Sequence, residues 1–147
     1  KQFDYHNYYL KIYDKAMHYG VDENIIRFEV KHKTSKSFNP LGAFNIHDLK
    51  SKTVLQNLFD DLLKRFDELT IVDNIPTDST ITIKDKRKLE SYLSYNYWSK
   101  HFDRKDRNLK GREKKAFERL LVKNDLLKTK ASLRASLIQK FTELLNS

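Results

Sequence analysis

Residues 25–33 read IIRFEVKHK and carry the clearest strand pattern in the chain. Apolar and charged residues alternate along it, and β-branched and aromatic side chains are frequent. This pattern predicts a strand with one buried face and one solvated face. The apolar face would hold Ile26, Phe28 and Val30, and the charged face Arg27, Glu29 and Lys31.

Residues 8–15, YYLKIYDK, also alternate. As a strand they would place Leu10 and Ile12 on one face, and Tyr9, Lys11, Tyr13 and Lys15 on the other. A helix is an alternative, because Tyr5, Tyr8, Tyr9, Ile12 and Ala16 fall at helical spacing. We favour the strand for its aromatic and β-branched content. The short connection GVDEN, residues 20–24, then predicts an antiparallel hairpin, with Tyr13, Lys15, Arg27 and Glu29 on a shared face.

The segment after the hairpin predicts a loop at residues 34–42, which contain Pro40 and Gly42. Asn45 is suited to cap a short helix that has Asp48 in its first turn. A long amphipathic helix follows, which we expect to cover one face of the sheet. Its apolar stripe consists of Leu55, Leu58, Phe59, Leu62, Leu63, Phe66 and Leu69.

Residues 71–72 could form a short strand before a loop at residues 73–79, where we expect a boundary between two modules. Three helices are then predicted, at about residues 85–101, 110–123 and 131–145. Their expected inward residues are Leu89, Tyr92, Leu93 and Tyr97; Phe117, Leu120 and Leu121; and Leu133, Leu137, Ile138, Phe141, Leu144 and Leu145.

The fold class predicted is therefore α+β. An antiparallel β-hairpin or small sheet would pack on a long amphipathic helix, followed by a three-helix basic segment. We expect an α+β part at residues 1–75, the end of a nuclease-like domain. Residues 80–147 would be a helical, basic module.

Composition limits the class of protein. The 147 residues contain 39% hydrophobic and 12% aromatic residues, enough for a core, but only 3 Gly and 2 Pro. There is no Cys, which suggests a reducing compartment, the cytoplasm. No apolar run approaches the roughly 20 residues that cross a bilayer, so we expect no membrane partner. The chain begins with Lys1 in what reads as an ordered segment, so we expect a fragment of a longer protein.

Positive charge is concentrated in the second half. Residues 1–80 carry 11 basic and 12 acidic residues, whereas residues 81–147 carry 18 and 8, within a total net charge of +9. Such asymmetry is typical of polyanion binders, although a solvated helical surface is an alternative. Tyr95 and Trp98 could stack on bases, or Trp98 could anchor a small core. The candidate phosphate-binding residues are Lys84, Lys86, Arg87, Lys88, Arg104, Lys105, Arg107, Lys110, Arg112, Lys114 and Lys115.

The sequence offers no self-contained metal or nucleotide site. The five histidines are scattered, and there is no Gly-rich phosphate loop. Tyr13 is a different candidate, because a tyrosine can attack a phosphodiester when nearby cations favour its phenolate. Lys11 and Lys15 lie two residues away on either side, and Arg27 or Lys31 could assist across the hairpin. Alternatively, Tyr9 and Tyr13 are ordinary strand aromatics.

The order IYDK, a turn, IIRFEVKHK and a loop ending in LGAFNIHDL resembles the latter part of rolling-circle replication initiators of the filamentous-phage gene II and gene X family. The resemblance covers about residues 8–50. It implies a nucleophilic Tyr13 with Lys15 as its lysine, and it matches Arg27, Phe28 and Glu29 to the family's second element. Tyr9 and Lys11 form a second Tyr-x-Lys and are the reserve catalytic pair.

The resemblance also implies a function. The parent protein would be a DNA-nicking endonuclease from a phage or plasmid, active in the cytoplasm of a bacterial host on single- or double-stranded origin DNA. It would use Mg²⁺ or Mn²⁺. No cofactor is expected within this chain, because the family's upstream histidine pair is missing; the fragment alone should be inactive. His18 also departs from the family, where an acidic residue often stands. The alternatives are a non-enzymatic DNA-binding module and a protein-interaction domain with a basic surface.

Overall fold

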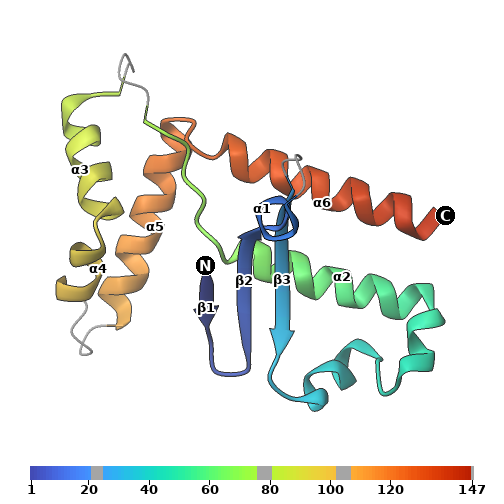
Figure 1. The fold of residues 1–147 in the computed structure, drawn as a ribbon. Coiled ribbons are helices and arrows are strands. Elements are labelled where there is room, and N and C mark those ends of the chain that lie inside the picture. The colour runs from blue at the N-terminus through green and yellow to red at the C-terminus, as the bar shows by residue number, and fades with distance from the viewer. Residues whose placement is uncertain (21–24, 76–80, 102–106, 147) are drawn as a thin grey trace. The chain divides into compact units, whose positions relative to one another are not determined.

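The computed structural model describes residues 1–20, 25–75, 81–101 and 107–146. Three strands form an antiparallel sheet in the order β1–β2–β3 (Figure 1). They are β1 (Gln2–Asp4), β2 (Tyr8–Asp14) and β3 (Ile26–His32). The fold is α+β, as predicted. The strand interpretation of residues 8–14 is also confirmed, and β1 is a further strand that was not predicted.

The β2–β3 pair has the register expected of a hairpin, with Tyr13 opposite Arg27 and Lys11 opposite Glu29. The connection begins differently from the prediction, because Lys15–Tyr19 forms a helical turn, α1. Asp14 caps this turn by accepting a hydrogen bond of 3.1 Å from the backbone N–H of Met17. Lys15 is therefore not a strand residue. Residues 21–24 of the predicted turn lie outside the described residues.

One face of the sheet is buried. Leu10 is fully buried, and Tyr8 is buried beside it. The helix α2 (Lys52–Asp67) contributes Phe66, whose ring meets that of Phe28 edge-on at 5.5 Å. The predicted amphipathic helix is therefore present and contacts the sheet. Ile26 opens β3 on the same face as Phe28, as predicted, but it is 65% exposed, so this end of the apolar face is not covered.

Two short 3₁₀ helices connect β3 to α2: η1 (Ser35–Leu41) and η2 (Ile46–Lys50). The first replaces the predicted loop, and it ends at Gly42, whose φ of 82° is readily adopted by glycine. The second has the predicted Asn45 cap. Asn45 accepts a 2.8 Å hydrogen bond from the N–H of His47, and Asp48 accepts one of 2.9 Å from the N–H of Asn45.

The C-terminal part contains α3 (Ile83–Leu93), α4 (Tyr95–His101), α5 (Arg107–Lys123) and α6 (Lys128–Asn146). The single helix predicted at residues 85–101 is wrong, because the backbone is extended at Ser94. The indole N–H of Trp98 donates to the carbonyl of Tyr92, which orients α4 after this break. Leu93 is half exposed, not inward.

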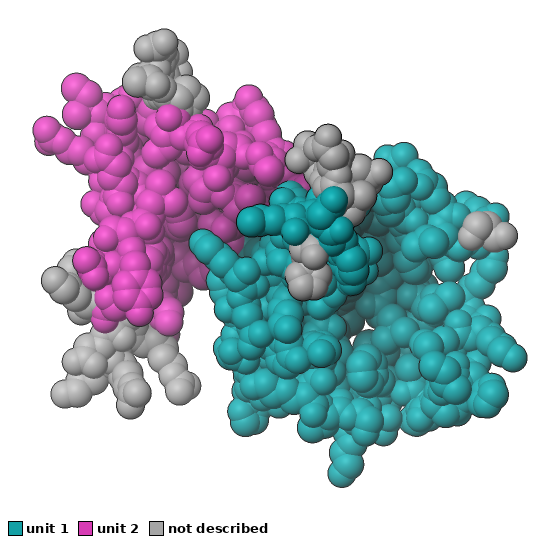
Figure 2. Space-filling view, viewed as in Figure 1, with its two compact units in different colours: residues 1–69, 136–147 teal, residues 70–135 magenta. Residues whose placement is uncertain are grey.

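The chain divides into two compact units: unit 1, residues 1–69 and 136–147, and unit 2, residues 70–135 (Figure 2). The core of unit 2 consists of Leu89, Tyr92, Phe117, Leu120, Leu121 and Leu126. The inward residues predicted for α5 are thus confirmed.

In α6, Ile138 and Leu144 are exposed, which corrects two of its predicted inward residues. Its half-buried stripe repeats every four residues, at Leu133, Leu137, Phe141 and Leu145.

The strand predicted at residues 71–72 is absent, because residues 70–75 form no strand. Asp73 lies there and caps α6. Its carboxylate accepts hydrogen bonds of 2.8 and 3.0 Å from the backbone N–H groups of Lys128 and Thr129. The side-chain hydroxyl of Thr129, followed by these backbone bonds, lowers the pKa of the Asp73 carboxyl. Within the described ranges, no helix has the length and apolar character that a membrane span requires.

Candidate functional site

The candidate site lies on the solvent-facing side of the β2–β3 ladder. The hydroxyl of Tyr13 donates to Oε1 of Glu29 at 2.8 Å, and Nη1 of Arg27 donates to the same hydroxyl at 3.2 Å. Arg27 also pairs with Glu29 at 3.3 Å. Tyr13, Arg27 and Glu29, singled out from the sequence, therefore form one hydrogen-bonded cluster, the Tyr13 cluster.

This cluster places a guanidinium and a carboxylate at the hydroxyl of Tyr13. The hydrogen bond to Tyr13 is the largest cause of the raised pKa of Arg27, so the guanidinium stays charged beside the phenol oxygen. The Glu29 carboxylate is in position to accept the phenol proton. The side chains of Arg27 and Glu29 are 39% and 32% exposed, so a phosphate group can reach them from solvent.

The lysines predicted to assist Tyr13 lie elsewhere. The ammonium of Lys15 is 5.4 Å from the centroid of the Tyr19 ring, in α1. The ammonium groups of Lys11 and Lys31 lie 5.6 and 5.8 Å from the centroid of the Tyr9 ring. Lys31 is the residue paired with Tyr9 across the β2–β3 ladder. The reserve tyrosine Tyr9 is thus the one flanked by two cations, whereas Tyr13 contacts a guanidinium and a carboxylate.

The predicted phosphate-binding residues belong to unit 2. Lys86 is half-buried, and the described side chains of the others are exposed: Lys84, Arg87 and Lys88 on α3, and Lys110, Arg112, Lys114 and Lys115 on α5. Arg104 and Lys105 lie outside the described residues. Arg107 opens α5, but its side chain is not described. Arg112, Lys115 and Arg119 have i, i+3, i+7 spacing, which makes a basic stripe opposite the buried face of α5. Arg119 was missed because only the residues up to 115 formed a dense run.

Partly buried hydrogen bonds in unit 2 account for the positions of several of its aromatic side chains. The hydroxyls of Tyr92 and Tyr97 donate to Oε2 of Glu113 at 2.8 and 2.9 Å, which lowers the pKa of that carboxyl. Trp98 packs against the same core and stacks on Tyr92 at 5.8 Å. Trp98 is therefore a core anchor. Tyr95 is 84% exposed and remains available for stacking on a base.

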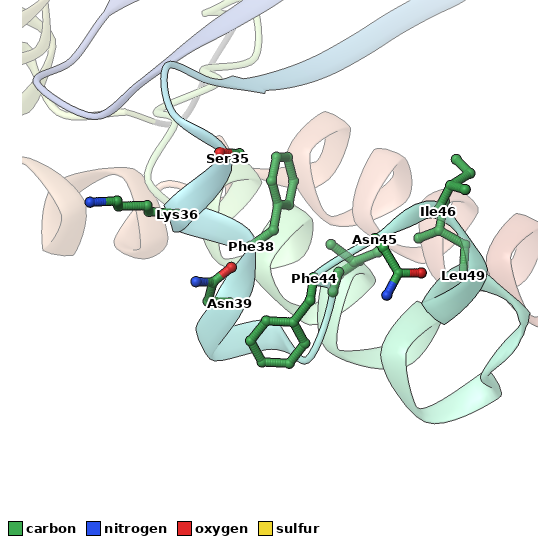
Figure 3. A pocket seen from close by; sticks show the side chains of 10 residues that line it. Ser35, Lys36, Phe38, Asn39, Phe44, Asn45, Ile46 and Leu49 are labelled. Carbon is green, nitrogen blue, oxygen red and sulfur yellow. The ribbon is translucent and has the colours of Figure 1, made fainter.

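A pocket of about 460 Å³ was not predicted (Figure 3). It lies in unit 1 between η1, η2 and α2. Sequence reasoning treated residues 34–42 as a loop, and the pocket exists because this segment folds into a 3₁₀ helix. The residues that line it are Ser35, Lys36, Phe38, Asn39, Ala43, Phe44, Asn45, Ile46, Leu49 and Leu58.

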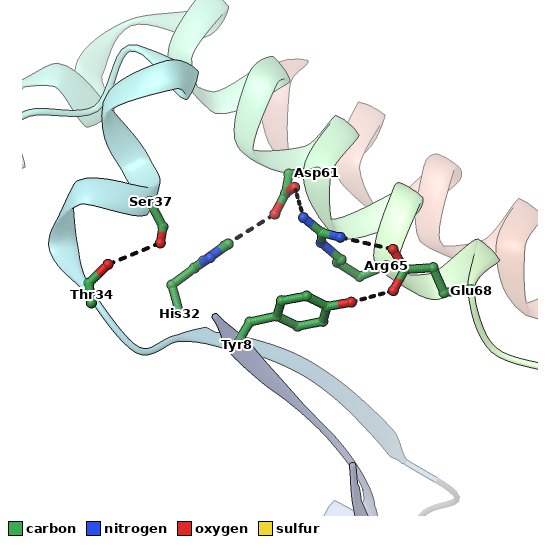
Figure 4. Close-up of polar contacts among 7 residues, drawn as sticks. All are labelled: Tyr8, His32, Thr34, Ser37, Asp61, Arg65 and Glu68. Carbon is green, nitrogen blue, oxygen red and sulfur yellow. Dashed lines mark hydrogen bonds and ion pairs between the residues drawn. The ribbon is translucent and has the colours of Figure 1, made fainter. Parts of the chain in front are cut away.

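A second polar cluster, between the sheet and α2, was also missed (Figure 4). Arg65 bridges Asp61 at 3.3 Å and Glu68 at 2.8 Å, and Asp61 also contacts His32 at 3.1 Å. The hydroxyl of Tyr8 donates to Glu68. Burial, followed by this hydrogen bond, raises the pKa of Tyr8 to about 12. Strand alternation places Tyr8 and His32 on the apolar face of their strands, and this was the signal in the sequence that could have indicated the cluster.

The Mg²⁺ or Mn²⁺ implied by the resemblance has no ligand set in the described part of the chain, where no three His, Cys, Asp or Glu side chains are grouped to hold an ion. The described residues therefore do not fit a metal site.

Comparisons of the chain with protein-family models, curated proteins and solved structures find no match.

Proposed function

We propose that this chain belongs to a phage- or plasmid-type DNA replication initiation protein, which nicks origin DNA through Tyr13 and binds DNA through the basic helices of unit 2. The observation that carries the proposal is the contact of the Tyr13 hydroxyl with both Glu29 and Arg27. A carboxylate that accepts the phenol proton and a guanidinium that stabilises the phenolate are what a tyrosine nucleophile requires.

The phenol proton of Tyr13 passes to Glu29 as the phenol oxygen bonds to the phosphorus of a DNA phosphodiester. The bond from phosphorus to the sugar oxygen on the other side breaks, and that oxygen takes a proton from water. The cut strand then remains attached as a phosphotyrosine. Arg27 stabilises negative charge on the phenolate and on the phosphate oxygens.

Unit 2 supplies the electrostatic attraction in this proposal. Phosphate contacts from Lys and Arg release counterions, so affinity falls steeply with salt. The α5 stripe of Arg112, Lys115 and Arg119 is exposed along one side of a single helix, which suits contact with a phosphate backbone.

The test uses the parent protein with supercoiled DNA of its own replicon and Mg²⁺ or Mn²⁺. We expect a nicked product in wild type and none in Tyr13→Phe, with equal DNA binding by both proteins. Equal nicking by Tyr13→Phe would exclude Tyr13 as the nucleophile.

A second candidate, a non-enzymatic DNA-binding module, is favoured by one observation: the hydrogen bonds of Tyr13 to Glu29 and Arg27 also stabilise a β-ladder without any chemistry. Salt-sensitive DNA binding without nicking under any metal would support this candidate.

A further inference from the structure

The pocket beside η1 combines aromatic side chains with the polar side chains of Lys36 and Asn39, which no described residue engages. Side chains of η1 lie on one side of it, and Ile46 and Leu49 of η2 lie on the other (Figure 3). The ring of Phe44 is 72% exposed and Ile46 is 74% exposed. Such an apolar surface, rimmed by polar groups, is typical of a binding site, and the volume lies in the range of small-ligand pockets.

The exposed ring of Phe44 stands on a fixed backbone. The N–H groups of Phe44 and Asn45 donate to Oδ2 of Asp48 at 2.8 and 2.9 Å. Gly42, two residues earlier, takes a left-handed conformation with φ 82°. The ring of Phe38 is packed edge-on against His32 at 4.8 Å. The backbone of Phe44 and the ring of Phe38 are thus held in position before any ligand arrives, which lowers the entropic cost of binding.

The polar groups of the pocket suit a nucleotide. The carboxamide of Asn39 and the ammonium of Lys36 have no hydrogen bond or ion pair among the described residues, and no carboxylate lines the pocket. The surrounding segment is basic: residues 31–52 contain five lysines and one acidic residue, Asp48. The Asp48 carboxylate is already engaged by two backbone N–H groups.

We propose that this pocket binds one nucleobase of single-stranded DNA. The base stacks on Phe44, the Asn39 carboxamide meets a polar edge of the base, and Lys36 contacts the adjacent phosphate. Aromatic stacking platforms beside cations are the usual means of binding single strands. The inference rests on the proposed DNA-binding function and adds to it a site for an unpaired base in unit 1, separate from the Tyr13 cluster and from the helices of unit 2.

The test measures the affinity of this chain for labelled single-stranded oligonucleotides by fluorescence anisotropy. Phe44→Ala should weaken binding roughly 5- to 100-fold, the effect of one lost base stack. Phe44→Trp should bind within about twofold of wild type, because it keeps a stacking surface. Leu144→Ala is the matched control: Leu144 is 73% exposed, like Phe44, and should not alter affinity. Circular dichroism checks that each variant is folded.

A second arm identifies the base. A series of oligonucleotides is used in which a single abasic site stands at successive positions. At one position the abasic site should weaken binding by wild type but should not weaken binding by Phe44→Ala any further, because the two changes remove the same contact. If the wild type binds DNA in a salt-sensitive manner but Phe44→Ala binds equally well, the pocket proposal is overturned and the proposed function stands. If the chain binds no DNA, both are overturned.

Discussion

The hydroxyl of Tyr13 donates a 2.8 Å hydrogen bond to Glu29, which lies diagonally across the β2–β3 ladder, because Glu29 is paired with Lys11 and Tyr13 with Arg27. Two residues from different parts of the sequence thus meet at the atom that would carry out the chemistry. A register shifted by one residue would place Glu29 on the buried face and remove this contact.

Glu29→Gln should slow nicking by the parent protein roughly 10²- to 10⁴-fold, the usual contribution of a general base. The amide keeps the shape of the side chain but cannot take the phenol proton, so DNA affinity should not change. Single-turnover nicking rates measure the effect. Glu143→Gln is the control, since Glu143 pairs with Lys140 on α6, away from the Tyr13 cluster. An unchanged rate in Glu29→Gln would remove Glu29 from the mechanism.

Arg65→Met should lower the free energy of unfolding by about 1–3 kcal/mol, because it leaves two partly buried carboxylates without their cation. Those carboxylates belong to Asp61 and Glu68. Urea denaturation measures the change. Lys64→Met is the matched control on the same helix, at an exposed position, and should change stability little. Equal effects in the two variants would mean that the cluster does not stabilise unit 1.

Tyr8 should make stability sensitive to alkaline pH. Its pKa is raised from 10.0 to about 12 in the folded chain, so the folded state holds the phenol proton more tightly than the unfolded state. This contribution is present below about pH 10 and is lost as the pH rises to about 12. The free energy of unfolding of wild type should therefore fall relative to that of Tyr8→Phe between pH 9 and pH 12. A pH-independent difference would contradict the raised pKa.

The basic stripe on α5 should determine the salt dependence of DNA binding. Lys115→Ala combined with Arg119→Ala should reduce the slope of log K against log salt by about 2, because each lost phosphate contact removes about 0.9. Lys140→Ala removes a positive charge from unit 1 instead, where Lys140 pairs with Glu143. We expect that control to leave the slope unchanged. If Lys140→Ala also reduces the slope, in proportion to the one charge that it removes, α5 is not the contact surface.

Much of the fold could be predicted because its signals are local. The alternation in residues 25–33 and the apolar stripe of α2 depend on side-chain periodicity alone. The α5 core residues Phe117, Leu120 and Leu121 follow from the same rule, and their burial confirms it.

The errors arose where nonlocal contacts or turn chemistry decide the structure. A hydrogen bond from Trp98 to Tyr92 accompanies the break at Ser94, and helical periodicity carries no sign of it. The cap that Asp73 provides for α6 joins segments 55 residues apart. In the candidate site, strand alternation placed Tyr13, Arg27 and Glu29 on one face. It could not show that Lys15 begins a helix and turns towards Tyr19.

Identifying the residue that becomes linked to DNA shows directly whether Tyr13 is the nucleophile. The parent protein is incubated with its origin DNA, digested with nuclease and protease, and analysed by mass spectrometry for a peptide that carries a nucleotide. We expect the nucleotide on Tyr13. A nucleotide on Tyr9, which lies between Lys11 and Lys31, or no modified peptide from a preparation that nicks DNA, would contradict the assignment.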